Sequence, residues 1–93
     1  MKDFSILIGG KAGDGIRQGG NLIAELFNQL GYWIFIYEEY PSLITGGHNF
    51  SVIRISPKRI LAHKEKIDLL IALNQETFIK HKNKLKKDSI ILY

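Results

Sequence analysis

Residues 9–15 are the part of this sequence in which residue type and spacing most clearly predict chemistry. Four glycines fall within the segment: Gly9, Gly10, Gly13 and Gly15. It follows a short apolar run and precedes a helical pattern, so it should bring bare backbone N–H groups and the positive end of a helix to one place. Such a place binds phosphate groups, and Lys11 and Arg17 can add cationic contacts. A tight strand-to-helix connection without a ligand would have the same spacing.

The established glycine motifs are not matched by this segment. The dinucleotide pattern G-x-G-x-x-G begins at Gly13 but has Gln18 in place of its third glycine, which disfavours an NAD or FAD site. A Walker pattern counted from Gly10 reaches isoleucine and arginine where lysine and serine or threonine are required. Residues 13–15 read Gly-Asp-Gly, as in the magnesium site of thiamine diphosphate enzymes, but residues 41–46 lack the asparagine that such a site needs. These three kinds of site are therefore not expected.

Other residue types narrow the chemistry further. The sequence has no cysteine, which excludes disulfides, thiolate zinc sites, cysteine nucleophiles and iron–sulfur clusters bound by this chain. The three histidines show no metal-ligand spacing, so no metal site is predicted. His63 and His81 lie among lysines, and we expect both at the surface. Ser42 and Thr45 have no recognisable acid or base partner, so a hydrolase triad is not expected.

The overall composition is that of an ordinary globular protein. Of 93 residues, 45% are hydrophobic and 24% are charged, which gives no signature of disorder. No apolar run is long enough to cross a bilayer and no signal-peptide pattern opens the sequence, so we expect a cytoplasmic protein without a membrane partner.

The net charge of +4 comes largely from a cluster near the C-terminus. The cluster consists of five lysines: Lys80, Lys82, Lys84, Lys86 and Lys87. Such a cluster could bind nucleic acid or an acidic protein, but we interpret it as a solvated helix face. A nucleic-acid site would have more aromatic side chains nearby, where only Phe78 is found.

Hydrophobic periodicity predicts alternating strands and helices. Strands are expected over residues 4–8, 32–37, 49–56, 68–73 and 89–93, with a short edge strand over residues 60–62 after a turn at residues 57–59. Helices are expected over residues 16–30, ended by Gly31, and over residues 75–86, with Asn74 as the N-cap.

These elements predict an α/β fold. Three of the expected strands contain runs that are apolar throughout: Ile6-Leu7-Ile8, Leu69-Leu70-Ile71 and Ile90-Ile91-Leu92. Such strands usually lie in a parallel sheet that is covered on both faces. We therefore expect a mostly parallel, Rossmann-like, three-layer sheet with helices on its faces. Two helices can hardly cover both faces of so many strands, so we expect a truncated domain with apolar surface left for a partner.

Three segments together resemble a known family. They are Gly9-Gly10-Lys11-Ala12-Gly13-Asp14-Gly15-Ile16 with Gly19-Gly20-Asn21, then Glu39-Tyr40-Pro41-Ser42-Leu43-Ile44-Thr45-Gly46-Gly47-His48-Asn49, then Asp68-Leu69-Leu70-Ile71-Ala72-Leu73. In order and spacing they resemble the gamma subunit or gamma domain of 2-oxoacid:ferredoxin oxidoreductases, the pyruvate and 2-oxoglutarate ferredoxin oxidoreductase family. They look most like the version fused ahead of the alpha domain in 2-oxoglutarate-type enzymes. The resemblance covers nearly the whole chain but only the N-terminal part of that domain.

The resemblance implies a structural and coenzyme-positioning role without catalytic residues in this chain. Residues 1–93 would be the N-terminal half of a single gamma-type α/β domain. The enzyme would convert a 2-oxoacid and coenzyme A to acyl-CoA and carbon dioxide, and pass electrons to ferredoxin. Thiamine diphosphate, magnesium and the iron–sulfur clusters would lie on partner subunits or domains. The implied partners are the alpha and beta subunits and, through the complex, ferredoxin, with oligomer contacts through an exposed sheet or helix surface.

The resemblance also implies two groups of site residues. Coenzyme A would be held at the glycine segment and the helix start by Gly10, Lys11, Gly13, Asp14, Gly15 and Asn21. An inter-domain or substrate-side loop would comprise Tyr40, Pro41, Ser42, Gly46, Gly47, His48 and Asn49. Within that loop His48 contacts either coenzyme A, a neighbouring domain or the nearby loop backbone. Thr45 departs from the family, which commonly has arginine before the glycine pair, so the loop lacks a cation and the 2-oxoacid used is left open.

Two other functions fit parts of the sequence. A stand-alone small nucleotide- or phosphate-binding α/β protein that oligomerises through its exposed sheet would use the same glycine segment. A basic interaction protein would bind nucleic acid through its lysines in a salt-dependent way. We favour the oxidoreductase role and expect no nucleic-acid partner.

Overall fold

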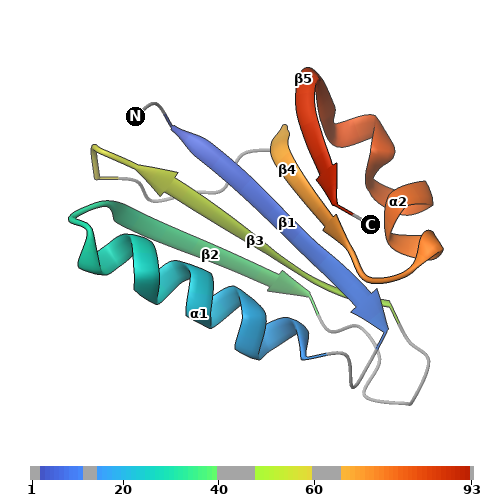
Figure 1. The fold of residues 1–93 in the computed structure, drawn as a ribbon, viewed down its shortest axis with the longest axis horizontal. Helices are drawn as coiled ribbons and strands as arrows, with labels where there is room; N and C mark the ends of the chain where they lie inside the picture. Colours follow the sequence, from blue (N-terminus) through green and yellow to red (C-terminus); the bar gives the residue numbers. More distant parts are fainter. Residues whose placement is uncertain (1–2, 12–14, 40–47, 60–65, 93) are drawn as a thin grey trace.

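The fold is a five-stranded sheet with a helix on each face. The computed structural model describes residues 3–11, 15–39, 48–59 and 66–92. The elements in chain order are β1 (Phe4–Lys11), α1 (Ile16–Gln29), β2 (Trp33–Glu39), β3 (His48–Ser56), β4 (Ile67–Ala72), α2 (Gln75–His81), the 3₁₀ turn η1 (Lys82–Lys84) and β5 (Leu85–Leu92). Figure 1 shows the strands in the spatial order β2-β3-β1-β4-β5. The first strand of the chain is therefore the central strand of the sheet.

Four strands run in one direction and β3 runs in the other. Strand β1 pairs in parallel with β4, and β4 pairs in parallel with β5. Strand β3 lies between β1 and β2 and is antiparallel to both. The predicted α/β class with helices on the faces of the sheet is confirmed. Four of the five strands share one direction, but two of the four strand pairings are antiparallel because β3 is inserted beside the centre.

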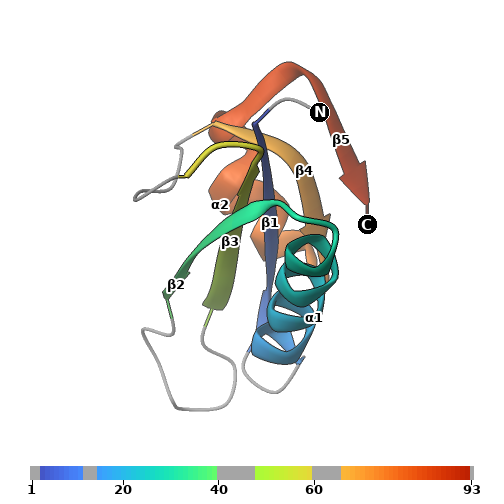
Figure 2. The same ribbon diagram turned by 90° about the vertical axis from the view of Figure 1, so that its left-hand side faces the viewer.

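Alternating side chains give the sheet two apolar faces. One face carries Ile6, Ile8, Ile53 and Ile55, which pack with Ile16 and Ala24 of α1. The other face carries Leu7, Phe50, Val52, Leu70 and Ala72, with Phe78 of α2 packed against them. Figure 2 shows the two helices on opposite sides of β1. Because neighbouring strand residues point to opposite faces, β1 contributes to both clusters and is buried throughout its centre.

Gly31 follows the end of α1 and Asn74 caps the beginning of α2, as predicted. Helix α1 is followed by Gly31, which has a left-handed φ of 95° and donates its N–H to the carbonyl of Asn28. Asn74 caps α2, because its Oδ1 accepts hydrogen bonds from the N–H of Thr77 at 3.0 Å and from the Thr77 hydroxyl at 2.7 Å.

Three boundaries differ from the sequence prediction by three residues or more. Strand β1 continues through Gly9, Gly10 and Lys11, because these residues pair with the first residues of β3. Helix α2 ends at His81 instead of residue 86, and β5 begins at Leu85 because Leu85 pairs with Ile67 of β4. The edge strand expected over residues 60–62 lies outside the described residues.

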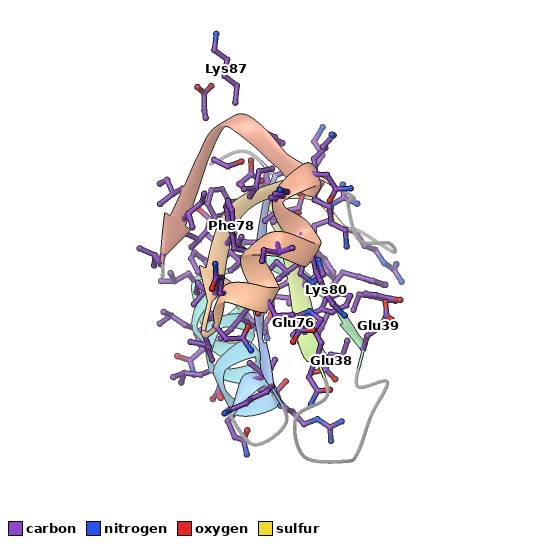
Figure 3. The ribbon with its side chains drawn as sticks, turned by 90° about the vertical axis from the view of Figure 1, so that its right-hand side faces the viewer. Glu38, Glu39, Glu76, Phe78, Lys80 and Lys87 are labelled. Carbon is purple, nitrogen blue, oxygen red and sulfur yellow. The ribbon has the colours of Figure 1, made fainter. Side chains whose placement is uncertain are left out.

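The lysines near the C-terminus do not form one helix face, contrary to prediction. Lys80 lies on α2, Lys82 and Lys84 on η1, and Lys86 and Lys87 on β5. Figure 3 shows Lys80 beside Glu76, and Lys87 at the far end of the molecule. The Nζ of Lys86 instead donates to Oδ1 of Asp68 at 2.7 Å, so one lysine helps to hold β5 on β4.

Candidate functional site

The two glycine-containing segments meet at one edge of the sheet. Gly10 is the cross-strand partner of Asn49, and Lys11 is the partner of His48. These four residues come from two segments for which separate roles are predicted. At the same edge β1 ends and α1 begins, so the end of the first segment and the start of the helix are close neighbours.

The first turn of α1 is suited to an anion. Gly15 is the N-cap, with a left-handed φ of 77° that strains any L side chain, and no side chain of the described residues is found to cap the helix. The N–H of Gly19 donates to the carbonyl of Gly15 at 2.9 Å and begins the helical bonds. The first turn contains no acidic residue. The helix dipole there is therefore not compensated by a carboxylate of its own turn.

Asn49 lies on the α1 face of the sheet, beside this first turn. Alternation puts Asn49 on the same face as Ser51, and Gly20 of α1 packs directly on Ser51. Asn49 is two residues nearer the beginning of β3, so it lies toward the beginning of α1. Its side chain is buried, at 7% exposure, and its Oδ1 has no hydrogen-bond partner among the described residues. A buried amide oxygen of this kind is a candidate ligand contact.

His48 points to the opposite face of the sheet, toward α2. It is buried against α2, where its Nε2 lies 2.8 Å from Nε2 of His81. The prediction that His81 is a surface residue is wrong, since only 4% of it is exposed. His81 lies four residues after the buried Thr77 on the inner side of α2. That i, i+4 spacing was the available sequence signal, and the surrounding lysines obscured it.

Burial and nearby lysines both favour the neutral imidazoles. Burial is the main cause that lowers the pKa of His48, and Lys80 adds to it. Burial likewise lowers the pKa of His81 to about 4, with further contributions from Lys84 and His48. The two side chains are therefore expected to be uncharged near neutral pH.

The remaining predicted site residues divide into two groups. Asn21 is exposed on the second turn of α1, on the same helix as Gly15. Gly13 and Asp14 lie outside the described residues. So does the part of the second segment that contains Tyr40, Pro41, Ser42, Gly46 and Gly47. Within the described part of the chain no group of three or more metal-binding side chains is found, and no helix is long and apolar enough to cross a membrane.

Comparison with known sequences identifies the family. The profile of the pyruvate ferredoxin/flavodoxin oxidoreductase family matches residues 5–93. A 2-oxoacid:ferredoxin oxidoreductase subunit alpha from Sulfolobus sp is 37% identical over 78 residues, which cover 84% of this chain. Subunit alpha of 2-oxoacid:ferredoxin oxidoreductase 2 from Aeropyrum pernix is 31% identical over the whole chain. The chain spans only 12% and 14% of the length of these two relatives.

Solved structures agree with this assignment. The chain superposes with a TM-score of 0.88 and 26% identity on the 2-oxoglutarate:ferredoxin oxidoreductase from Magnetococcus marinus, solved with 2-oxoglutarate, coenzyme A and succinyl-CoA bound; 98% of this chain and 16% of that one are covered. The gamma subunit of a keto/oxoacid ferredoxin oxidoreductase from Geobacter sulfurreducens shares the fold, with a TM-score of 0.82, 24% identity and coverage of 98% of this chain and 50% of that one. The chain therefore belongs to the pyruvate ferredoxin/flavodoxin oxidoreductase family.

Proposed function

We propose that this chain is the first half of a gamma-type domain in a 2-oxoacid:ferredoxin oxidoreductase, and that its β1–α1 junction positions coenzyme A. The observation that carries the proposal is the superposition, at a TM-score of 0.88, on a 2-oxoglutarate:ferredoxin oxidoreductase solved with coenzyme A bound. Two relatives, at 37% and 31% identity, are named alpha subunits, whereas this chain covers 50% of the gamma subunit from Geobacter sulfurreducens. Both fit a gamma-type domain fused ahead of an alpha domain.

The residues of the junction fit the phosphates of coenzyme A. The first turn of α1 offers backbone N–H groups and contains no acidic residue of its own, and Lys11 and Arg17 are exposed at the same edge. Gly10, Gly15 and Asn21 would line the approach, with Gly13 and Asp14 between them in sequence. The orphaned Oδ1 of Asn49 would accept a hydrogen bond from a donor group of the coenzyme.

The rest of the reaction would take place on partner subunits or domains. The enzyme would convert a 2-oxoacid and coenzyme A to acyl-CoA and carbon dioxide, with electrons passed to ferredoxin. This chain has no cysteine to ligate an iron–sulfur cluster, so its residues do not fit that cofactor. The contribution of this chain would be to hold coenzyme A, which accepts the acyl group, in place.

An uncovered apolar surface would provide the contacts with those partners. Leu22, Leu26 and Leu30 of α1 are more than half exposed. Ile90 and Leu92 of β5 are exposed on the same face, because they pair with Leu69 and Ile71, which pack with the α1 cluster. Neither helix covers this part of the sheet (Figure 2). An apolar surface of this kind on a soluble protein marks an interaction site.

Calorimetric titration of the chain with coenzyme A, combined with gel filtration, tests the proposal. We expect saturable binding of coenzyme A that is weakened by Asn21→Asp, because the new carboxylate would repel the phosphates. A repulsion of about 1 kcal/mol at this exposed position corresponds to roughly a fivefold higher Kd. Asn28→Asp, which adds the same charge near the other end of α1, is the matched control and should leave the Kd unchanged.

The alternative function gives a different result in the same experiment. A well-folded oligomer that ignores coenzyme A but binds another nucleotide would identify a stand-alone nucleotide-binding protein. That outcome would reject the coenzyme A role.

A further inference from the structure

Two buried histidines join the beginning of β3 to the end of α2. His48 is the first residue of β3 and His81 is the last residue of α2, and their Nε2 atoms are 2.8 Å apart. The exposed fractions of the two residues are 8% and 4%. The ring of Phe50 closes the cluster, with its centroid 5.7 Å from that of His48 and 4.5 Å from that of His81. The contact therefore links elements that are far apart in the sequence.

The short contact requires the two neutral imidazoles to be different tautomers. At this distance one Nε2 must carry the hydrogen that the other Nε2 accepts, so the neutral pair contains one Nε2–H and one Nδ1–H tautomer. Both Nδ1 atoms are buried, and neither has a hydrogen-bond partner among the described residues. One of them is thus an orphaned donor and the other an orphaned acceptor. Two apolar side chains of similar shape would fill the same space without this cost.

Charged groups reach the pair from three elements and from η1. They are Glu76 and Lys80 of α2, Lys84 of η1, Glu39 of β2, and Lys11 of β1 as the cross-strand neighbour of His48. Figure 3 shows Glu76 and Lys80 of α2 in the same part of the view as Glu39 at the end of β2. Lys84 additionally lies over the ring of Phe50, with its Nζ 5.1 Å from the centroid. Lys80 and Lys84 disfavour an added proton on either imidazole, whereas Glu76 and Glu39 partly offset this effect at His48.

We propose that the His48–His81 contact is a proton-sensitive clasp, which holds the end of α2 on β3 while both imidazoles are neutral and opens when they take up protons from solvent. One added proton leaves a hydrogen bond but puts a positive charge in a buried site beside two lysines. A second proton places two Nε2–H donors against each other, and no hydrogen bond remains. The clasp lies at the edge of the sheet where β1 ends. His48 is itself the first residue of β3, so opening the clasp would release this end of β3 from α2.

The direction of the pH dependence follows from the lowered pKa values. Both histidines have a lower pKa in the folded chain than the ordinary value of 6.5. The unfolded chain therefore binds more protons below about pH 6.5, and acid favours it. The stabilisation by the clasp is complete above about pH 6.5 and is lost as the pH falls toward the folded pKa of His81, about 4.

Nuclear magnetic resonance of the histidine rings in the unmodified chain tests the clasp directly. Near neutral pH we expect one ring of the pair to be the Nε2–H tautomer and the other the Nδ1–H tautomer, with both titration midpoints below 6.5. The third histidine, His63, supplies a reference signal in the same sample. Identical tautomers for His48 and His81, or midpoints at the ordinary value, would overturn the proposal.

Replacement of the pair provides a second, independent test. The double variant His48→Phe with His81→Leu should lose most of the acid-induced decrease in urea midpoint between about pH 7 and pH 5. His63→Gln is the matched control and should retain that decrease. A double variant that loses stability in acid as the unmodified chain does would refute the clasp. If the double variant does not fold, the tautomers of the unmodified chain decide the question. Neither test depends on coenzyme A binding.

Discussion

The close packing of α1 on β3 can be tested by adding a methyl group at Gly20 and removing the hydroxyl group of Ser51. Gly20 faces Ser51 of β3, and a Cβ at position 20 would lie 2.9 Å from Oγ and 3.4 Å from Cβ of Ser51. Ser51 is fully buried, and its strand is held between β1 and β2. The first distance is too short for a carbon–oxygen contact, whereas the second is an ordinary one. In the variant Gly20→Ala, the new methyl group should therefore clash only with the hydroxyl of Ser51.

The sizes of two opposing effects decide whether each variant is less or more stable than the unmodified chain. Alanine gains about 1 kcal/mol over glycine in a helix interior. The forced contact costs about 1–3 kcal/mol. Gly20→Ala alone is thus expected to lower the free energy of unfolding by up to about 2 kcal/mol. Adding Ser51→Ala relieves the contact and removes a buried hydroxyl without a hydrogen-bond partner among the described residues. The double variant should then exceed the unmodified chain by at least about 1 kcal/mol.

Urea denaturation of the two single variants and the double variant gives the coupling energy. We expect a coupling of about 1–3 kcal/mol between the two positions. Gly19→Ala is the matched control on the same helix, because its Cβ would meet only the terminal Cδ1 of Ile8, at 3.1 Å. It should show no coupling to Ser51→Ala. If the effects of Gly20→Ala and Ser51→Ala add to within about 0.5 kcal/mol, α1 does not pack on Ser51 as closely as described.

Three further substitutions have defined outcomes in the same denaturation assay. Asn74→Ala removes the cap on α2 and should cost about 1 kcal/mol, whereas a cost near zero would contradict the capping role. Gly9→Ala should destabilise by about 1–3 kcal/mol, because its Cβ would lie 2.5 Å from Cγ2 of Thr77; tolerance would show that α2 does not pack this closely on β1. Gly31→Ala should cost about 1 kcal/mol through its positive φ alone, since nothing lies near its Cβ; a stabilised variant would contradict that backbone conformation.

The parts of the fold that local chemistry determines could be predicted from the sequence. The apolar run of β4, the periodicity of α1, the positive φ at Gly31 and the cap at Asn74 all depend on residues within a few positions of each other. Apolar surface beyond the reach of two helices was also predicted, and Leu22 and Ile90 are among the residues that expose it.

Features that depend on distant partners could not be predicted in this way. Gly9 and Gly10 have the residue types of a turn, but pairing with β3 keeps them in a strand, and Gly9 also admits Thr77 of α2. Helical spacing favoured a longer α2, but the pairing of Leu85 with β4 ends the helical segment earlier.

The candidate site was predicted as two separate segments. Its residue types were recognised, but the cross-strand register that sets Gly10 beside Asn49 is a long-range property. The same register carries His48 to the α2 face, where it meets His81. Neither pairing could be predicted from the local sequence, because the two partners of each contact lie far apart in the chain.

Mapping of backbone amide shifts in the isotope-labelled chain during titration with coenzyme A tests the central claim most directly. The account predicts that the largest shifts fall on the described residues of the β1–α1 junction, namely Gly10, Lys11, Gly15 and Ile16, and that they saturate together. Largest shifts on α2 or β5, or no shifts with coenzyme A while another nucleotide moves the junction amides, would contradict it.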